Sequence, residues 1–152
     1  PPRSTLFPYT TLFRSRLDFL SALDYPVLLY DLPKAKRQLE TFLCEHLERN
    51  LFAWIALESE SLAAVGFLQV IQVMWQPAAP GGKYGRIINI LTWPEFRHQG
   101  LAREIMQALI QKARDLDLAY VDLDASPDGQ PLYESLGFNL LQAKHPPMRL
   151  YL

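Results

Sequence analysis

Apolar residues follow two spacings along the chain, one typical of helices and the other typical of strands. A spacing of three or four positions places apolar side chains on one face and predicts helices at residues 34–50, 100–117 and 130–136. Runs of branched and aromatic side chains predict strands at residues 52–57, 63–75, 86–92 and 119–125, with one or two more in 138–152. Helices and strands in this order predict a mixed α/β sheet, with 86–92 as its central strand.

Two stretches interrupt this pattern. Residues 16–33 are apolar but contain Pro26 and Pro33, so they fit either a short helix or a broken strand. Residues 76–85 are rich in proline and glycine, which predicts a loop ahead of the central strand. The sequence contains no repeats and no low-complexity segment, and we expect a single domain.

Composition narrows the class of protein. Of the 152 residues, 49% are hydrophobic and 20% are charged, which is typical of a globular domain with a real core. The formal net charge is −1, so no basic excess indicates binding to nucleic acid or to an anionic membrane. Cys44 is the one cysteine, and the three histidines lack metal-ligand spacing, so we expect neither a disulfide within the chain nor a bound metal. No apolar run approaches the ~20 residues that span a bilayer, and the expected location is the cytoplasm.

The first fifteen residues stand apart from the rest. Residues 5–15 (TLFPYTTLFRS) show neither spacing, and they resemble, residue for residue, the in-frame translation of a widely used short-read sequencing adapter. We therefore interpret residues 1–15 as an artefact and residues 16–152 as one domain that is truncated at its amino end.

The most informative segment joins the central strand to the longest helix, at residues 89–102 (NILTWPEFRHQGLA). The helix begins with Gly100, Leu101 and Ala102. The free backbone N–H groups of a first helical turn and the positive end of the helix dipole favour an anion. Glycine and alanine let an anion approach the backbone closely, and Arg97 adds positive charge. The segment indicates a phosphate or pyrophosphate ligand, although many helices begin this way without one; it contains neither a P-loop nor a Gly-x-Gly-x-x-Gly motif.

A family resemblance makes this indication specific. The spacing Arg97-x-x-Gly100-x-Ala102 matches the (Arg/Gln)-x-x-Gly-x-(Gly/Ala) signature of the GNAT superfamily of N-acetyltransferases. A second segment, LYESLGF at residues 132–138, is similar to the family's Leu-Tyr-x-x-x-Gly-Phe motif. The resemblance covers residues 86–138 most strongly. It implies the GNAT-like acyl-CoA N-acyltransferase fold, here without its first strand, and acetyl-CoA or another acyl-CoA as co-substrate.

The resemblance also implies where acetyl-CoA binds. Its pyrophosphate would lie on the backbone N–H groups at the start of the long helix, and its pantetheine arm would run beside the central strand like an added strand. A backbone N–H of Leu91 or Thr92 would polarise the thioester carbonyl. Many relatives carry Asn where this chain has Ser126, which leaves that contact open. The residues expected to bind the co-substrate are Ile90, Leu91, Thr92, Arg97, His98, Gln99, Gly100, Leu101, Ala102 and Ser126.

Two residues are candidates for proton transfer. Tyr133 occupies the position of the family's general acid and would protonate the leaving thiolate; the alternative is that its ring only packs under the CoA arm. Some relatives carry a Glu early in the central strand, whereas this strand begins with Arg86 and offers Asn89 as its polar interior residue. Asp124 faces the acceptor side if its strand alternates regularly, but it also fits a role as a partner of Arg149 or as a turn cap.

These observations predict an enzyme that transfers an acetyl group from acetyl-CoA to a primary amine. The short loop ahead of the central strand favours a small-molecule acceptor over a long peptide. Trp75, Tyr84 and Trp93 flank the expected acceptor region, either as pocket residues or as ordinary core and rim aromatics. A CoA-binding sensor and a non-catalytic interaction domain on the same fold are the alternatives. The oligomeric state is open, with a homodimer as one alternative.

Overall fold

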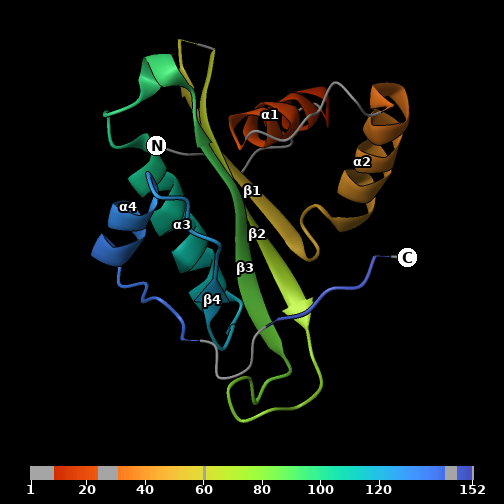
Figure 1. The fold of residues 1–152 in the computed structure, drawn as a ribbon, viewed down its shortest axis with the longest axis vertical. Helices are drawn as coiled ribbons and strands as arrows, with labels where there is room; N and C mark the ends of the chain where they lie inside the picture. Colours follow the sequence, from red (N-terminus) through yellow and green to blue (C-terminus); the bar gives the residue numbers. More distant parts are fainter. Residues whose placement is uncertain (1–8, 24–30, 60, 143–146, 152) are drawn as a thin grey trace.

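The structure, a computed structural model, describes residues 9–23, 31–59, 61–142 and 147–151. Its helices and strands alternate in a mixed α/β arrangement, as the sequence predicts (Figure 1). In chain order the elements are α1 (Tyr9–Ala22), α2 (Leu32–His46), β1 (Leu51–Glu58), β2 (Ser61–Gln72), β3 (Lys83–Thr92), the 3-10 turn η2 (Pro94–Phe96), α3 (Leu101–Asp115), β4 (Val121–Asp122) and α4 (Gln130–Ser135).

The four strands form one sheet in the order β1-β2-β3-β4. β1, β2 and β3 pair antiparallel, and β4 joins β3 in parallel. The connection from β3 to the parallel β4 runs through α3, as a parallel crossover requires. Figure 1 shows α1 and α2 on one face of the sheet and α3 and α4 on the other. β3 is therefore an inner strand covered on both faces, which confirms the expectation that it is central.

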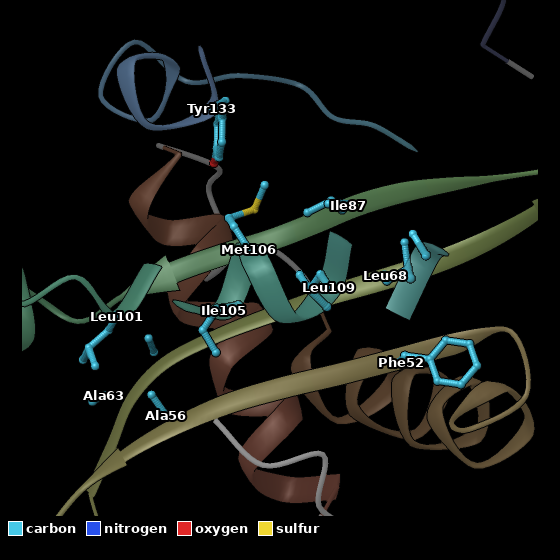
Figure 2. Packing of buried hydrophobic residues seen from close by; sticks show 12 residues of the cluster. Phe52, Ala56, Ala63, Leu68, Ile87, Leu101, Ile105, Met106, Leu109 and Tyr133 are labelled. Atoms are coloured by element: carbon cyan, nitrogen blue, oxygen red, sulfur yellow. The ribbon is translucent and has the colours of Figure 1, made fainter. Parts of the chain in front are cut away.

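The face of the sheet under α3 holds the larger core. The predicted apolar stripe of α3 is confirmed, because the side chains that it buries recur at helical spacing: Leu101, Ile105, Met106, Leu109 and Ala113. They pack against Phe52, Leu68 and Ile87 from three strands (Figure 2). Burying each large apolar side chain contributes ~1.5–3 kcal/mol, so this stripe fixes α3, and with it the turn before α3, against the sheet.

The opposite face is covered by α1 and α2. Asp31 caps α2 by accepting a hydrogen bond from the Lys34 backbone N–H at 2.9 Å, and a proline in the first turn suits the same start. Leu12 of α1 and Leu43 of α2 are each 2% exposed and pack with Phe67 of β2 in a second cluster. Among the described residues, no helix is long and apolar enough to cross a membrane.

The structure at the amino end does not show the boundary that we expected from the sequence. α1 begins at Tyr9 and continues through the boundary that we placed between residues 15 and 16. Leu12 and Ser15, which lie before that boundary, are buried, and the Ser15 hydroxyl donates to the Leu12 carbonyl at 2.7 Å. Residues 9–15 thus form part of a packed helix, although their origin as an adapter translation stays a prediction. Of the two alternatives for residues 16–33, the helix is confirmed as far as Ala22, while residues 24–30 lie outside the described part.

Two strand predictions at the carboxyl end need correction. The strand expected at residues 119–125 is reduced to Val121–Asp122, because the chain diverges from β3 after two pairs. The strands expected in residues 138–152 are absent from the described parts of that range, 138–142 and 147–151. There Leu140, Leu141 and Leu150 are exposed rather than packed on the sheet. Apolar composition alone therefore overestimated strand content where no partner strand lies alongside.

Candidate functional site

The backbone edge of β3 becomes open halfway along the strand. β3 pairs with β4 at Gly85↔Val121 and Arg86↔Asp122 only, yet β3 itself continues to Thr92. Beyond Arg86 the two chains separate, so residues 87–92 have strand neighbours on the β2 side alone among the described residues. A strand with an unpaired edge offers N–H and C=O groups to an extended ligand. This is the place where the sequence resemblance puts the pantetheine arm.

A β-bulge lies within this open segment. Val65 of β2 pairs with Leu91 and Phe67 pairs with Ile88, so Gly66 alone lies opposite both Asn89 and Ile90. Asn89 has a positive φ of 57°, which asparagine tolerates better than most residues. The extra residue shifts the alternation of side chains. Ile90 packs in the α3 cluster, whereas Asn89 is 2% exposed and accepts a hydrogen bond from Arg16 of α1, on the opposite face.

The direction of the backbone groups separates the two candidate donors at the strand end. The Trp93 N–H donates to the Ala63 carbonyl at 3.1 Å, so it points toward β2. Since backbone groups alternate along a strand, the Leu91 N–H also points toward β2 and the Thr92 N–H points toward the open edge. The Thr92 carbonyl agrees with this direction, because it accepts from Arg97 Nε at 3.2 Å. Of Leu91 and Thr92, the second therefore faces the place expected for the thioester.

The turn from β3 into α3 supplies consecutive free backbone donors. His98 and Gly100 have positive φ values of 62° and 83°, and this left-handed backbone lets the chain reverse into the helix. The first intrahelical bond runs from Glu104 N–H to the Gly100 carbonyl, and the N–H groups of residues 98–103 donate to no described residue. Such a run of amides at a helix start is an anion site. A Cβ added at Gly100 would meet no atom within 4 Å, so the approach to these amides is open.

The predicted binding residues in this turn lie mostly at the surface. Arg97, His98, Gln99 and Gly100 are exposed, which leaves them accessible to a ligand. Leu101 is instead 9% exposed and packs in the core, and Ala102 is half-buried, so these two residues offer their backbone rather than their side chains.

A pocket of about 370 Å³ adjoins the open edge of β3. Its walls come from α1, β3, α4 and the loop that follows β4, and the polar lining residues are Arg16, Asn89, Asp124, Ser126 and Tyr133. The apolar lining residues include Phe19 and Leu20 of α1 and Ile87 and Ile90 of β3. Four of the predicted site residues, Ile90, Asp124, Ser126 and Tyr133, therefore line one pocket, while their roles stay predictions. Trp75, Tyr84 and Trp93 do not line this pocket: Tyr84 stacks on Tyr120, and Trp93 donates to Asp18.

Tyr133 reaches from α4 into the protein interior. Its side chain is 8% exposed, and Figure 2 shows the hydroxyl end directed toward the sheet. Gly129 makes room for the ring, since a Cβ there would lie 2.8 Å from Tyr133 Cε2. Phe138 contacts the ring edge-on at a centroid distance of 6.2 Å. Burial raises the pKa of Tyr133 above its usual value near 10, so the phenol is a protonated donor at neutral pH.

Asp124 is held by a different residue from the one considered in the sequence. Its Oδ2 accepts from Arg86 Nη2 of β3, while Arg149 lies over the ring of Tyr151. Arg86 Nη1 also donates to Asp122 Oδ1 at 3.3 Å. Burial raises the pKa of Asp122, and Asp124 raises it further, against the opposite effect of Arg86. Burial lowers the pKa of Arg86, but the two carboxylates outweigh it and the net change is upward.

Ser126 has a structural partner within its own turn. Its hydroxyl accepts from the Gly129 N–H at 3.2 Å, and its carbonyl accepts from the Gln130 N–H at 2.9 Å. Ser126 therefore shapes the turn into α4 and also lines the pocket. Arg16 and Phe19 were not predicted from the sequence, because the apolar residues of α1 show only a weak helical spacing and because residues 1–15 were set apart from the domain.

The sequence profile of the acetyltransferase (GNAT) family matches residues 17–138. The chain belongs to this family. The match includes the turn before α3, the open edge of β3 and Tyr133, so the geometry described above lies within the GNAT domain. The protein is accordingly an acyltransferase by family.

Solved structures show the same fold. A predicted acetyltransferase with acetyl-CoA from Clostridium acetobutylicum has a TM-score of 0.80 at 22% identity, covering 93% of this chain and 89% of the other. A GCN5-related N-acetyltransferase from Ralstonia eutropha has a TM-score of 0.78 at 23% identity, with 92% of each chain covered. The glucosamine-6-phosphate N-acetyltransferase of Arabidopsis thaliana has a TM-score of 0.67 at 17% identity, covering 99% of this chain and 97% of the other. No curated protein matches the chain.

Proposed function

We propose that this GNAT protein transfers an acetyl group from acetyl-CoA to the primary amine of a small molecule in the cytoplasm. The observation that carries the proposal is that the open edge of β3 leads, through one short turn, to the unpaired amides at residues 98–103. An acyl-CoA needs both parts, because its pantetheine arm is extended and polar while its pyrophosphate is an anion. The Clostridium acetobutylicum structure of the same fold contains acetyl-CoA, which supports this choice of donor.

The residues of the site fit such a ligand. Thr92 Oγ1 is buried with no partner among the described residues, next to the backbone N–H that faces the open edge. Gly100 leaves its surroundings clear of side-chain atoms. An acetyl-CoA molecule would supply the activated acyl thioester, and the protein would supply donors for its carbonyl and phosphates.

Three groups act on the reacting atoms in this proposal. The Thr92 N–H polarises the thioester carbonyl while the unprotonated amine forms the new N–C bond. Tyr133 donates its proton to the sulfur as the C–S bond breaks, since its raised pKa keeps the phenol protonated. Asp124, at the pocket edge beside Arg86, receives the proton that the amine loses, directly or through water.

A small acceptor is favoured by the pocket itself. Its volume is about 370 Å³, and the thioester end of acetyl-CoA beside Ile90 and Tyr133 would fill part of it, so the space that remains suits a small molecule. The Arabidopsis thaliana neighbour is a glucosamine-6-phosphate N-acetyltransferase, so the same fold serves small amines elsewhere.

Titration calorimetry of acetyl-CoA into the full chain tests the proposal, because it needs no knowledge of the acceptor. We expect saturable binding at one site with a micromolar Kd, followed by release of free CoA thiol when a panel of small amines is added. Binding without thiol release for any amine would favour a CoA sensor. Absence of binding by a folded sample would leave the interaction domain as the remaining alternative.

A further inference from the structure

The pocket contains a pair of polar side chains to which the proposed acetyl transfer assigns no role. Arg16 of α1 donates through Nη1 to Asn89 Oδ1 of β3 at 3.3 Å, and both residues line the pocket. Asn89 is 2% exposed and Arg16 is half-buried. The contact joins residues 73 positions apart, so it exists only because α1 packs over the bulge of β3.

The second polar atom of Asn89 is a donor that lacks a partner. An arginine can only donate, so its contact identifies the amide oxygen as the atom that faces Arg16. Nδ2 is then the remaining atom, and it is buried without a hydrogen-bond partner among the described residues. Buried polar groups are ordinarily paired, and an orphaned one at a pocket wall indicates an acceptor atom supplied by a ligand.

The charges of the lining residues indicate which charged groups the ligand carries. A guanidinium has five N–H donors in a planar fork, so it can hold Asn89 and bind an oxyanion at the same time. Phe19 restrains it through a cation–π contact, with Arg16 Cζ 5.5 Å from the ring centroid. Asp124 is the acidic member of the same lining. One part of the pocket thus presents donors and positive charge, and another presents a carboxylate.

We propose that the acceptor is a small amine that also carries a carboxylate. Its carboxylate binds Arg16 and Asn89, and its amino group lies toward Asp124. One guanidinium and one amide N–H₂ match the two oxygens and single charge of a carboxylate. This assignment rests on the proposed acetyl transfer and names the substrate class of its pocket.

Binding of matched amines to the CoA-saturated protein tests the assignment directly. The pairs are L-phenylalanine with phenethylamine, L-leucine with 3-methylbutylamine, and 4-aminobutyrate with propylamine, which differ within each pair by the carboxylate. Calorimetry is expected to show that the carboxylate-bearing member of at least one pair binds 10-fold or more tightly than its partner. Glucosamine-6-phosphate serves as the phosphate-bearing comparison.

Two variants locate the effect. Arg16→Gln removes the charge and is expected to abolish the preference. Asn89→Asp places a carboxylate beside the guanidinium that competes with that of the ligand, and Asp tolerates the positive φ of this position. We expect it to abolish the preference while leaving the fold intact. Arg14→Gln, an exposed change on the same helix outside the pocket lining, is the matched control and is expected to retain the preference.

Among the amines, the assignment would be overturned by equal binding within every pair, by tighter binding of the amines without a carboxylate, or by a preference for glucosamine-6-phosphate over every carboxylate. Among the variants, it would be overturned if Arg14→Gln and Arg16→Gln lost the preference for the carboxylate equally. The absence of amine binding to a sample that does bind acetyl-CoA would overturn it as well, with the proposed function still standing. If acetyl-CoA itself does not bind, the proposed function fails and the acceptor assignment fails with it.

Discussion

Arg86 of β3 holds Asp124 through an ion pair just beyond the last backbone pair between β3 and β4. Their atoms Nη2 and Oδ2 are 2.5 Å apart, although the Asp124 side chain is 90% exposed. Backbone pairing stops at Arg86, so this side-chain contact keeps the diverging chain next to the open edge of β3. The pair thereby positions one wall of the pocket, including the carboxylate that we propose as proton acceptor.

Asp122 supplies the second carboxylate that contacts Arg86, and its burial leads to a prediction about how stability depends on pH. Burial raises the pKa of Asp122 in the folded state, so the folded protein binds this proton more tightly than the unfolded chain does. The resulting stability is present below pH ~4 and is lost as the pH rises through the raised pKa. Asp122→Asn removes the cost of burying the charge, and we expect it to raise the free energy of unfolding at pH 7 by less than about 1 kcal/mol.

Urea unfolding at pH 7 and at pH 3 measures this difference, which is expected to vanish at the lower pH. Asp128→Asn, at an exposed position, is the control. A lower stability of Asp122→Asn at pH 7 would show that the contact with Arg86 outweighs the effect of burial.

Gly100→Glu is expected to abolish acetyl-CoA binding. The new side chain would project from a residue with open surroundings and place negative charge beside the unpaired amides of residues 98–103. Gly100→Asn is the matched control, since Asn accepts the φ of 83° and adds no charge. Calorimetry of both variants separates the effects: unchanged affinity in Gly100→Glu would exclude this turn as the phosphate site.

Tyr133→Phe is expected to lower kcat by ~10²-fold or more while the Kd of acetyl-CoA stays within twofold. The ring and its contact with Phe138 remain, and only the proton donor is lost. Tyr120→Phe, in a tyrosine stacked on Tyr84 and outside the pocket lining, is the control. Equal losses in turnover and in binding would assign Tyr133 a packing role alone.

The raised pKa of Tyr133 has its own consequence for stability. Burial favours the neutral phenol in the folded state, so this contribution is complete below pH ~10 and is lost as the pH rises through the raised pKa. Above pH ~10, we expect the stability of Tyr133→Phe to fall less steeply with rising pH than that of the parent protein. Circular dichroism during alkaline titration measures the slope, and parallel curves would contradict the prediction.

Leu12→Ala tests whether the first half of α1 is part of the folded domain. From the sequence alone, residues 1–15 were expected to be dispensable, but Leu12 is 2% exposed in the cluster with Leu43 and Phe67. Truncating a buried leucine costs ~2–5 kcal/mol, so thermal and urea unfolding are expected to show that loss. Arg14→Ala, on the exposed side of α1, is expected to change stability by less than about 0.5 kcal/mol. Equal stabilities of the two variants would show that residues 9–15 do not contribute to the stability of the domain.

Features of this protein that depend on contacts within one segment could be predicted from its amino-acid sequence. The stripe of α3 is readable because burial on one helix face imposes a spacing of three or four residues. The turn before α3 is readable because a tight start at Gly100 and an approachable backbone require small residues at fixed positions. The order of elements from α2 to α4 and the family therefore followed from patterns within single segments.

The set of side chains that share the pocket depends on contacts between distant segments. Regular alternation along β3 would place Asn89 on the same face as Ile87, beneath α3. The bulge opposite Gly66 moves Asn89 to the other face, where it contacts Arg16 of α1. In the same way, the short β4 and the Arg86–Asp124 pair depend on where β3 loses its neighbour. Contacts between distant residues determine the bulge, the end of β4 and the packing of α1. Periodicity within one segment reports which of its faces is buried, and it cannot predict such contacts.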